Sequence, residues 1–528
     1  MARLDQPAFH RSIDDQATTS STGGRAMVTL VDERMLDERL ARLEAARPWS
    51  PRVVSRLEAL IRTGDDGALF RVNPFTFASE RGLDEGEAVD LFLHATALGL
   101  FEMDWLLICP RCACAVESFA RLRAVLRRFR CPECHNEYEA AMDDFIAIYF
   151  TVSPQIRAIR YHRPETLEPF DYMFVFKGVR EGRRPDGQPF VDFVRSALRG
   201  LSYLEPQETA TFAFEAAEGA LHGISSDTDA GFVLQVGAEP TSEPQRLRLT
   251  YLGTGYQPDE AVLAPGPVAL EVANPTSRRG VLAILQAAPG DDDAPLRFDP
   301  YLTGKHLLTS QTFKSLFRSE VVGGAQGLAI RDIALLFTDI RGSTALYQRI
   351  GDLNAFQLVQ QHFDLLRETT VRHGGAIVKT IGDAVMAAYP DAALAVGAAL
   401  DMLGAIERFN EDQPERPVSL KIGIHHGAAI AVTLNDELDY FGQTVNIASR
   451  VQEMADAAEV WITEAVWRYP GVRALLEPYP TEPRTAEFHG IEQPMTVVRV
   501  GSRRHAAAES RSSSPHTAGG QMRDKVGE

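Results

Sequence analysis

The sequence predicts a multidomain protein that ends in an α/β (α+β) domain, and three observations support this. The chain has 528 residues, which at roughly 150 residues per domain suggests three or four domains. Residues 331–500 alternate apolar, strand-like segments with segments of helical periodicity. Residues 141–300 instead contain short strand-like runs separated by Gly, Pro and Asn, which is typical of a β-sandwich.

Composition and charge exclude several classes of protein. Hydrophobic residues make up 45% and charged residues 24%, so the chain is neither wholly disordered nor collagenous nor a coiled coil. The charge sum is 54 − 72 = −18, and such a field repels nucleic acid and anionic lipid. The first residues are polar, and no stretch of about 18 residues lacks charges. We therefore expect a soluble, cytoplasmic protein with neither nucleic acid nor a membrane as partner.

The N-terminal part is expected to be helical. Residues 1–26 and 501–528 are polar and predict disordered tails. Within residues 27–104, apolar residues recur at three- and four-residue spacing, at Leu36, Leu40, Leu43, Val54, Leu57 and Leu60. Two further segments, Phe75–Glu80 and Asp84–Leu98, predict a helical hairpin of winged-helix type. The charges near it are mostly acidic, which favours packing or docking over DNA binding.

All five cysteines lie within residues 105–140, which predict a zinc ribbon. Two Cys-x-x-Cys pairs are separated by eighteen residues, within the spacing expected of a four-cysteine zinc site. These four residues are Cys109, Cys112, Cys131 and Cys134. Four thiolates make a closed site, so the one Zn²⁺ would be structural. Cys114 and His135 are the alternate ligands, although we interpret Cys114 as a free thiol. A ribbon that packs without metal and redox chemistry are the alternatives.

The middle of the chain gives architecture but no activity. Residues 141–300 predict a β-rich regulatory domain with strands at Phe145–Val152, Tyr172–Phe176, Arg246–Tyr251, Val268–Val272 and Gly280–Gln286. Residues 301–330 predict a connector, with a helix near Ser310–Arg318 that ends before the Gly-Gly pair at 323–324. The ligand or partner of the regulatory region cannot be read from the sequence.

Residues 331–500 predict a sheet with helices on one face. The expected strands are Ile333–Ile340, the hairpin Ala376–Ile381 and Ala384–Tyr389, Leu420–Val432 as a pair or one bent strand, Val460–Thr463 and Thr496–Val500. The expected helices are Ser343–Arg372, Ala392–Phe409 and Thr444–Met454.

Two carboxylates are the first candidates for chemistry. Asp339 ends a buried strand, and Gly342 then leads into a helix whose first amides, at Ser343 and Thr344, suit phosphate oxygens. Asp383 follows a glycine in the predicted hairpin turn, so the two carboxylates converge if the hairpin neighbours the strand. Converging Asp residues without His or Cys suit Mg²⁺ and phosphoryl chemistry. A lone Asp at such a place is more often a helix or strand cap.

A third segment carries an amide and a cation on one helix face. Asn446 and Arg450 are four residues apart in a short, mostly apolar helix. An arginine there is suited to charge that develops on a transferring phosphoryl group. The alternative is a solvated helix face.

The three segments read FTDIRGST, VKTIGDAVMAAY and DYFGQTVNIASR, and in order and spacing they resemble the class III adenylate/guanylate cyclase catalytic domain across residues 331–500. The resemblance implies a ferredoxin-like palm in which Asp339, the Ile340 carbonyl and Asp383 bind two Mg²⁺ or Mn²⁺ ions. It implies that Lys379 and Asp439 read the adenine ring, which favours ATP over GTP, that Asn446 orients the ribose, and that Arg450 stabilises the α-phosphate. The implied products are cyclic AMP and pyrophosphate.

In this family the metal pair comes from one subunit and the other four residues from its twin, so the resemblance implies a homodimer. One segment departs from the family pattern, because His489 stands before Gly490 where a triphosphate-binding Lys is common. The segment DWLLICPRC…CPEC followed by FTVSPQIR resembles an uncharacterised domain found before bacterial cyclase domains. The alternatives are a catalytically silent nucleotide-binding signalling module, a zinc-ribbon nucleic-acid binder and, without its signature motif, a diguanylate cyclase.

Overall fold

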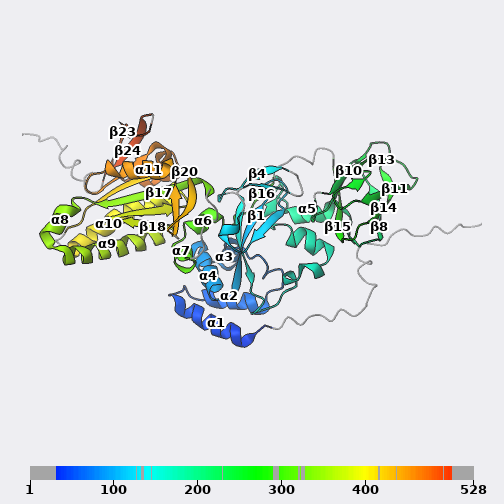
Figure 1. Cartoon of the computed structure of the whole chain (residues 1–528), viewed down its shortest axis with the longest axis horizontal. Coiled ribbons are helices and arrows are strands. Elements are labelled where there is room, and N and C mark those ends of the chain that lie inside the picture. The colour runs from blue at the N-terminus through cyan, green and yellow to red at the C-terminus, as the bar shows by residue number, and fades with distance from the viewer. Residues whose placement is uncertain are drawn as a thin grey trace, which may run out of the picture.

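The structure, a computed structural model, describes residues 31–125, 128–131, 136–143, 145–228, 230–288, 296–318, 322, 327–413, 417–435, 437–491 and 493–501. Its elements form three bodies (Figure 1). A central body of helices and a small sheet lies between a β-sandwich on one side and the C-terminal sheet with its helices on the other (Figure 1). Within the described residues, no helix is both long and apolar enough to cross a lipid bilayer.

The central body begins with four helices: α1 (Glu33–Ala46), α2 (Val53–Thr63), α3 (Pro74–Arg81) and α4 (Glu85–Ala97). Asp32, Asn73 and Asp84 cap α1, α3 and α4 by accepting hydrogen bonds from first-turn amides. The leucines and valines that predict α1 and α2 are all buried, which confirms these helices and the α3–α4 hairpin.

The helices pack on a three-stranded sheet of order β2 (Ala115–Phe119), β1 (Phe101–Ile108) and β5 (Ile146–Val152). β5 pairs with β1 in antiparallel register, Phe101 opposite Val152, so this strand lies with the helices rather than in the β-sandwich. Next to this sheet lie the cysteines, together with a short helix (Leu122–Ala124) and the hairpin β3 (Arg128–Arg130) and β4 (Glu137–Glu139).

The segment Tyr172–Phe176, expected as a strand, is instead helical. Residues Asp171–Phe176 form a π-type turn, in which Tyr172 stacks on Phe176 with ring centroids 6.0 Å apart. Its apolar side chains contact two different hydrophobic clusters, so the run is apolar on every side. A uniformly apolar run has no period, and periodicity alone cannot tell a strand from a helix there.

The β-sandwich consists of two sheets with a shared core. The first has the order β13 (Glu260–Leu263), β10 (Gly231–Val236), β9 (Gly219–Ile224), β15 (Gly280–Ala287) and β7 (Leu198–Leu204). The second has the order β12 (Tyr256–Gln257), β11 (Gln245–Tyr251), β14 (Gly266–Ala273) and β8 (Thr209–Ala216). Between β5 and the sandwich lie two short 3₁₀ turns (Arg160–His162 and Pro164–Thr166), β6 (Gly182–Arg183) and α5 (Phe190–Ala197). β16 (Arg297–Phe298) returns to pair with β6.

Two short helices, α6 (Gly304–Leu308) and α7 (Gln311–Leu316), lead into the C-terminal part. Ser310 caps α7 by accepting from the Phe313 amide at 3.3 Å, which confirms a helix at this place in the connector. The Gly-Gly pair at 323–324 lies outside the described residues.

The C-terminal sheet has the order β18 (Ala376–Ile381), β19 (Ala384–Tyr389), β17 (Leu328–Ile340), β20 (Leu420–Leu434), β22 (Glu459–Thr463), β24 (Met495–Val500) and β23 (Thr481–Ala486), and β21 (Glu437–Phe441) pairs with β20. Its helices are α8 (Ser343–Ile350), α9 (Asp352–Arg372), α10 (Ala392–Asp412), α11 (Gln443–Glu453), α12 (Glu464–Trp467) and α13 (Val472–Leu476).

Two expectations for this sheet are wrong. The helix predicted over Ser343–Arg372 is broken at Gly351, which has a φ of +78° and separates α8 from α9. Helices also cover both faces of the sheet rather than one. α9 and α10 pack on the face that holds Ala334 and Leu336. α11 packs on the opposite face so closely that a Cβ at Gly423 would lie 2.1 Å from the Gln452 amide nitrogen.

Candidate active site

The structure brings the two predicted carboxylates together at one end of the sheet. Asp339 is the penultimate residue of β17, and Asp383 follows Gly382, whose φ of +65° forms the tight turn between β18 and β19. β19 pairs with β17, Val385 opposite Thr338, and so places the turn beside the end of β17. Burial and the charge of Asp383 raise the pKa of Asp339. The two groups therefore repel each other unless a cation lies between them.

The donor atoms at this end fit a divalent cation. Among the described residues, the Oδ2 atom of Asp383 is buried without a hydrogen-bond partner. Burial and the charges of Asp383 and Asp339 raise the pKa of the neighbouring Tyr347 to about 12, so its hydroxyl stays neutral. Carboxylate oxygens with the backbone carbonyl of Ile340 are the hard ligands that Mg²⁺ prefers.

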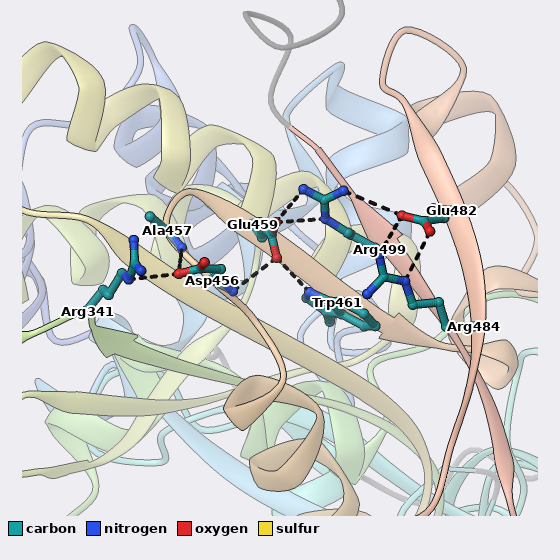
Figure 2. Close-up of polar contacts among 8 residues, drawn as sticks. All are labelled: Arg341, Asp456, Ala457, Glu459, Trp461, Glu482, Arg484 and Arg499. Atoms are coloured by element: carbon teal, nitrogen blue, oxygen red, sulfur yellow. Dashed lines mark hydrogen bonds and ion pairs between the residues drawn. The ribbon is translucent and has the colours of Figure 1, made fainter.

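The turn after β17 is held by an ion-pair network (Figure 2). Arg341 contacts Asp456, just after α11, with Nε 2.7 Å from Oδ1. Glu459 accepts hydrogen bonds from the Asp456 amide at 3.0 Å and from Trp461 Nε1 at 2.9 Å, and it pairs with Arg499 of β24 (Figure 2). These contacts tie the turn to the far strands of the sheet.

The start of α8 follows this turn, as expected. Gly342 precedes the helix with a φ of +66°, and no side chain caps the first turn. The amides near Ser343 and Thr344 are thus left for an external acceptor, and the N-terminus of a helix favours anions.

Lys421 is a candidate that our sequence reasoning missed. It lies opposite Asp339 in the antiparallel pairing of β17 with β20, and its charge lowers the pKa of Asp339 against the larger effects of burial and Asp383. A Lys at the start of a predicted strand is an ordinary observation. The register between the strands, which the sequence does not specify, is what places this cation beside the carboxylates.

Lys379 and Asp439 form an ion pair. Lys379 Nζ donates to Asp439 Oδ2 at 2.6 Å, which joins edge strand β18 to β21. The side chain of Asp439 is 10% exposed and that of Lys379 is 39% exposed, so a ligand can reach the lysine more easily. The other oxygen of Asp439 accepts from the Tyr440 amide at 2.8 Å, which fixes the carboxylate.

Asn446 and Arg450 lie on α11, as expected. Asn446 is exposed, and Arg450 is partly buried and donates from Nη1 to the backbone carbonyl of His489. Within the part of the chain that the structure describes, no hydrogen bond or ion pair joins either residue to Asp339 or Asp383.

The cysteine cluster contains three of the four predicted ligands. The sulfur atoms of Cys109, Cys112 and Cys131 lie within 4.8 Å of one another, an arrangement that could hold a metal ion. Cys134 and His135 lie outside the described residues. Hydrogen bonds with neighbouring thiols, Cys112 first, lower the pKa of Cys109, which favours the thiolate that binds metal. Cys114 is no isolated thiol: it is buried, with Sγ 3.3 Å from Cys131 Sγ.

Two known families match the chain, one in its C-terminal part and one in the part before it. Residues 328–475 match the adenylate and guanylate cyclase catalytic domain, which confirms the resemblance carried by the three motifs. Residues 36–315, more than half of the chain, match a family of unknown function, DUF5939. The chain belongs to this family, and the matched residues include the cysteine cluster, the β-sandwich and the central body from Leu36 on.

Two curated relatives each match about a quarter of the chain. An adenylate cyclase of Anabaena cylindrica is 30% identical over 153 residues, which are 26% of this chain and 30% of the relative. Adenylate cyclase 2 of Rhizobium meliloti is 30% identical over 151 residues, 26% of this chain and 41% of the relative. The chain thus spans less than half the length of these relatives. The crystal structure of the adenylyl cyclase CyaB from P. aeruginosa is 20% identical, with a TM-score of 0.30, covering 32% of this chain and 93% of that one.

Proposed function

We propose that the C-terminal domain is an active adenylate cyclase, which converts ATP to 3′,5′-cyclic AMP and pyrophosphate. The observation that carries the proposal is the Lys379–Asp439 pair at 2.6 Å, in the same sheet as the facing carboxylates of Asp339 and Asp383. An ammonium beside a carboxylate matches adenine, because adenine offers a ring-nitrogen acceptor and an exocyclic amino donor on one edge. Guanine offers the opposite pattern at its six-position, so the pair favours ATP over GTP.

Each candidate residue has a role in the proposed reaction. The ribose 3′-hydroxyl attacks the α-phosphorus, the bond to the bridging oxygen of pyrophosphate breaks, and the hydroxyl proton is lost. Asp339, Asp383 and the Ile340 carbonyl would hold two Mg²⁺ or Mn²⁺ ions, which supply charge neutralisation at the phosphates. Asn446 orients the ribose, and Arg450 stabilises the charge that develops on the α-phosphate.

Phosphate binding would use groups that surround the carboxylates. The first-turn amides near Gly342, Ser343 and Thr344 would donate hydrogen bonds to phosphate oxygens. Lys421 lies opposite Asp339 and supplies a fixed positive charge there. A Lys is common in this family at the position of His489, and Lys421 would supply the positive charge that such a Lys provides. The backbone carbonyl of His489 accepts a hydrogen bond from Arg450.

We further propose that two chains complete the site. Asp339 and Asp383 of one protomer would share a nucleotide with Lys379, Asp439, Asn446 and Arg450 of its partner. One feature supports this: exposed apolar side chains lie beside the Lys379–Asp439 pair. These side chains are Ile381, Ile430 and Phe441, which are 52%, 37% and 66% exposed. Apolar surface of this kind is typical of interaction sites.

The experiment that tests the function is product analysis on the full chain. Purified protein is incubated with ATP and Mn²⁺ or Mg²⁺, with GTP in parallel, and cyclic nucleotide and pyrophosphate are measured by chromatography and mass spectrometry. We expect equal amounts of cyclic AMP and pyrophosphate, and little cyclic GMP. Asp339→Asn should abolish both products, whereas Asp364→Asn, on the exposed surface of α9, should not. Nucleotide binding without product would instead identify a silent signalling module.

We also propose that the cysteine cluster binds one structural Zn²⁺. Three sulfur atoms within 4.8 Å fit a tetrahedral thiolate site, which needs a fourth ligand. Cys134 has the spacing for that role. A closed site of this type stabilises the fold around it and takes no part in the cyclase reaction.

A further inference from the structure

A polar cavity lies in the central body, away from the candidate active site. It has a volume of about 540 Å³ and lies between the loop before α3, α3 itself and the segment 180–183. Binding cavities for small molecules commonly measure about 300–1,000 Å³. Four arginines and four acidic residues line it: Arg71, Arg81, Arg180, Arg183, Asp65, Glu80, Glu181 and Asp299.

Two of the arginines are already paired. Arg81 Nη1 lies 2.8 Å from a Glu80 oxygen, and Arg183 Nε lies 2.6 Å from an Asp299 oxygen. Within each pair, the arginine and the acid neutralise each other's charge. The recognition properties of the cavity therefore depend on the remaining two arginines and two acids.

Donors of the protein engage both oxygens of Glu181 and one oxygen of Asp65. Glu181 is buried and accepts hydrogen bonds from the Tyr149 hydroxyl at 2.8 Å and from Asn73 Nδ2 at 3.2 Å. Asp65 accepts from the Ala68 amide at 2.7 Å. The buried Glu181 carboxylate is therefore satisfied by the protein, whereas Asp65 is exposed to solvent at the cavity.

The two remaining arginines still have donors to offer. Arg71 donates from Nη1 to the Phe176 carbonyl at 2.7 Å, but its Nε is buried without a hydrogen-bond partner among the described residues. Arg180 is exposed beside Gly67 and forms no ion pair within the described part of the chain. Two guanidinium groups that line one cavity favour a ligand with acceptor oxygens.

Arg71 has a strained backbone conformation. Its φ of +48° is unfavourable for a residue with a side chain, and such strain persists where the surroundings require it. Its guanidinium lies over the rings of Phe70 and Phe176, at 4.9 and 5.6 Å from their centroids. Burial, and to a smaller extent the charge of Arg180, lower the pKa of Arg71, although Asp104, Tyr149 and Glu181 oppose this. An anion between Arg71 and Arg180 would relieve the repulsion.

We propose that this cavity binds a small organic or inorganic anion with a carboxylate or phosphate group, held by Arg71 and Arg180. Residues that line the cavity also contact the chain just before the connector. Asn73 Nδ2 donates to the Pro300 carbonyl at 2.9 Å, and the Asp299 amide donates to the Glu181 carbonyl at 2.9 Å. A ligand in the cavity would therefore influence the position of the segment that leads through α6 and α7 to the catalytic sheet. This consequence rests on the proposed function.

Calorimetric titration of the full chain tests the binding itself, independently of catalysis. Inorganic phosphate and citrate are the two probes, used separately at constant ionic strength without added divalent cation or nucleotide. We expect saturable binding of at least one probe. Arg180→Ala should weaken it at least tenfold, equivalent to about 1.4 kcal/mol. Arg71→Lys keeps the charge but loses the planar fork, so it should also weaken binding.

Arg248→Ala, at an exposed position of β11 in the sandwich, is the matched control and should bind as the unchanged protein does. A preference for phosphate or for citrate would identify the ligand's anionic group, and either supports the proposal. No saturable binding of either probe, or equal affinity in Arg180→Ala, would overturn it. Melting temperatures show whether each variant is folded. If Arg71→Lys is not, Arg180→Ala alone decides.

Discussion

Lys314 of α7 donates a hydrogen bond from Nζ to the backbone carbonyl of Ile377, at 3.0 Å, on edge strand β18 of the catalytic sheet. It also contacts the Val378 carbonyl, and Gln311 accepts from the Ile377 amide at 2.9 Å. Burial lowers the pKa of Lys314, against the charges of Glu437 and Asp439. The connector is therefore hydrogen-bonded to the strand that carries Lys379, at the two residues immediately before this lysine.

The first prediction is that Lys314→Met uncouples the connector from β18. The variant loses both hydrogen bonds to the strand, and Lys379 is then positioned less firmly. We expect kcat/KM for ATP to fall about tenfold, equivalent to roughly 1.4 kcal/mol. Hydrogen exchange at the β18 amides should become faster. This second measurement is independent of catalysis.

Arg318→Met is the matched control, because Arg318 follows α7, is exposed, and has no hydrogen bond or ion pair within the described residues. It should change neither quantity. If the β18 amides exchange at the same rate in Lys314→Met as in the unchanged protein, the hydrogen bonds from Lys314 do not stabilise this strand.

The second prediction concerns base choice at the Lys379–Asp439 pair. Lys379→Glu places two carboxylates together, where Asp439 is nearly buried. We expect kcat/KM for ATP to fall by more than about tenfold, because one hydrogen bond to a charged group is worth roughly 1.5–3 kcal/mol. The ratio of cyclic GMP to cyclic AMP should rise. An unchanged ratio would show that these residues do not read the base.

The strands and helices that hold the candidate site could largely be predicted from the sequence. β17 is apolar and buried, β18 and β19 flank a Gly-Asp turn, and α10 and α11 have clear helical periodicity. Each signal is local, and local signals are what periodicity reports. The edge strand β23 was missed because five of its six residues are exposed and carry no apolar pattern.

What could not be predicted is long-range. Lys421 approaches Asp339 only through the register of β17 and β20, and Lys314 approaches β18 only through the packing of the connector. Gly351 interrupts an otherwise continuous helical pattern through its φ of +78°, which a sequence does not display. Tyr172 and its neighbours are aromatic and apolar on all sides, so propensity favoured a strand where packing produced a helix.

The third prediction tests whether two chains share each site. Asp339→Ala and Arg450→Ala should each be inactive as homodimers, because every site then lacks one partner's contribution. When the two variants are mixed in equal amounts, half of the dimers are mixed and each has one complete site. Activity should therefore return to about a quarter of the unchanged protein's value.

Mixing Asp339→Ala with Asp383→Ala provides the control, since both changes affect the same half of the site. No activity should return in that mixture. Recovery there, or none in the first mixture, would contradict the shared arrangement. Sedimentation of each mixture shows whether dimers have formed.

The fourth prediction concerns the metal at the cysteine cluster. Cys131→Ser removes a buried sulfur that lies 3.5 Å from Cys112 Sγ, and we expect zinc content to fall from about one ion per chain to near none. The melting temperature should fall as well, because metal binding contributes to folding. Plasma mass spectrometry and thermal unfolding are the measurements.

Cys114→Ser separates the candidate fourth ligands. Full zinc content in this variant would exclude Cys114 and leave Cys134 or the alternate His135 as the fourth ligand, whereas lost zinc would assign that role to Cys114, which is 3.3 Å from Cys131. A Cys131→Ser chain with full zinc would refute the metal site altogether.

The fifth prediction is that the catalytic domain loses stability as pH falls, in part through His425. Burial, and then the charge of His426, lower the pKa of His425 to about 4, against about 6.5 in the unfolded chain. Between these two pKa values the unfolded state binds more protons than the folded state. The contribution of His425 to the free energy of unfolding is therefore complete above about pH 6.5 and is lost as the pH falls towards about 4. The slope from this group is at most about 1.4 kcal/mol per pH unit. Melting temperatures at about pH 7.5 and about pH 5.5 measure it.

His425→Gln removes this titration, although it also alters the contact of Nδ1 with Thr463 Oγ1 at 2.8 Å. The variant should therefore melt lower at the higher pH, yet lose less on acidification than the unchanged protein. His489→Gln, at an exposed position, should keep the full pH dependence. If His425→Gln and the unchanged protein lose equal stability between the two pH values, the neutral imidazole of His425 does not contribute to acid sensitivity, and other titrating groups such as the buried His362 account for it.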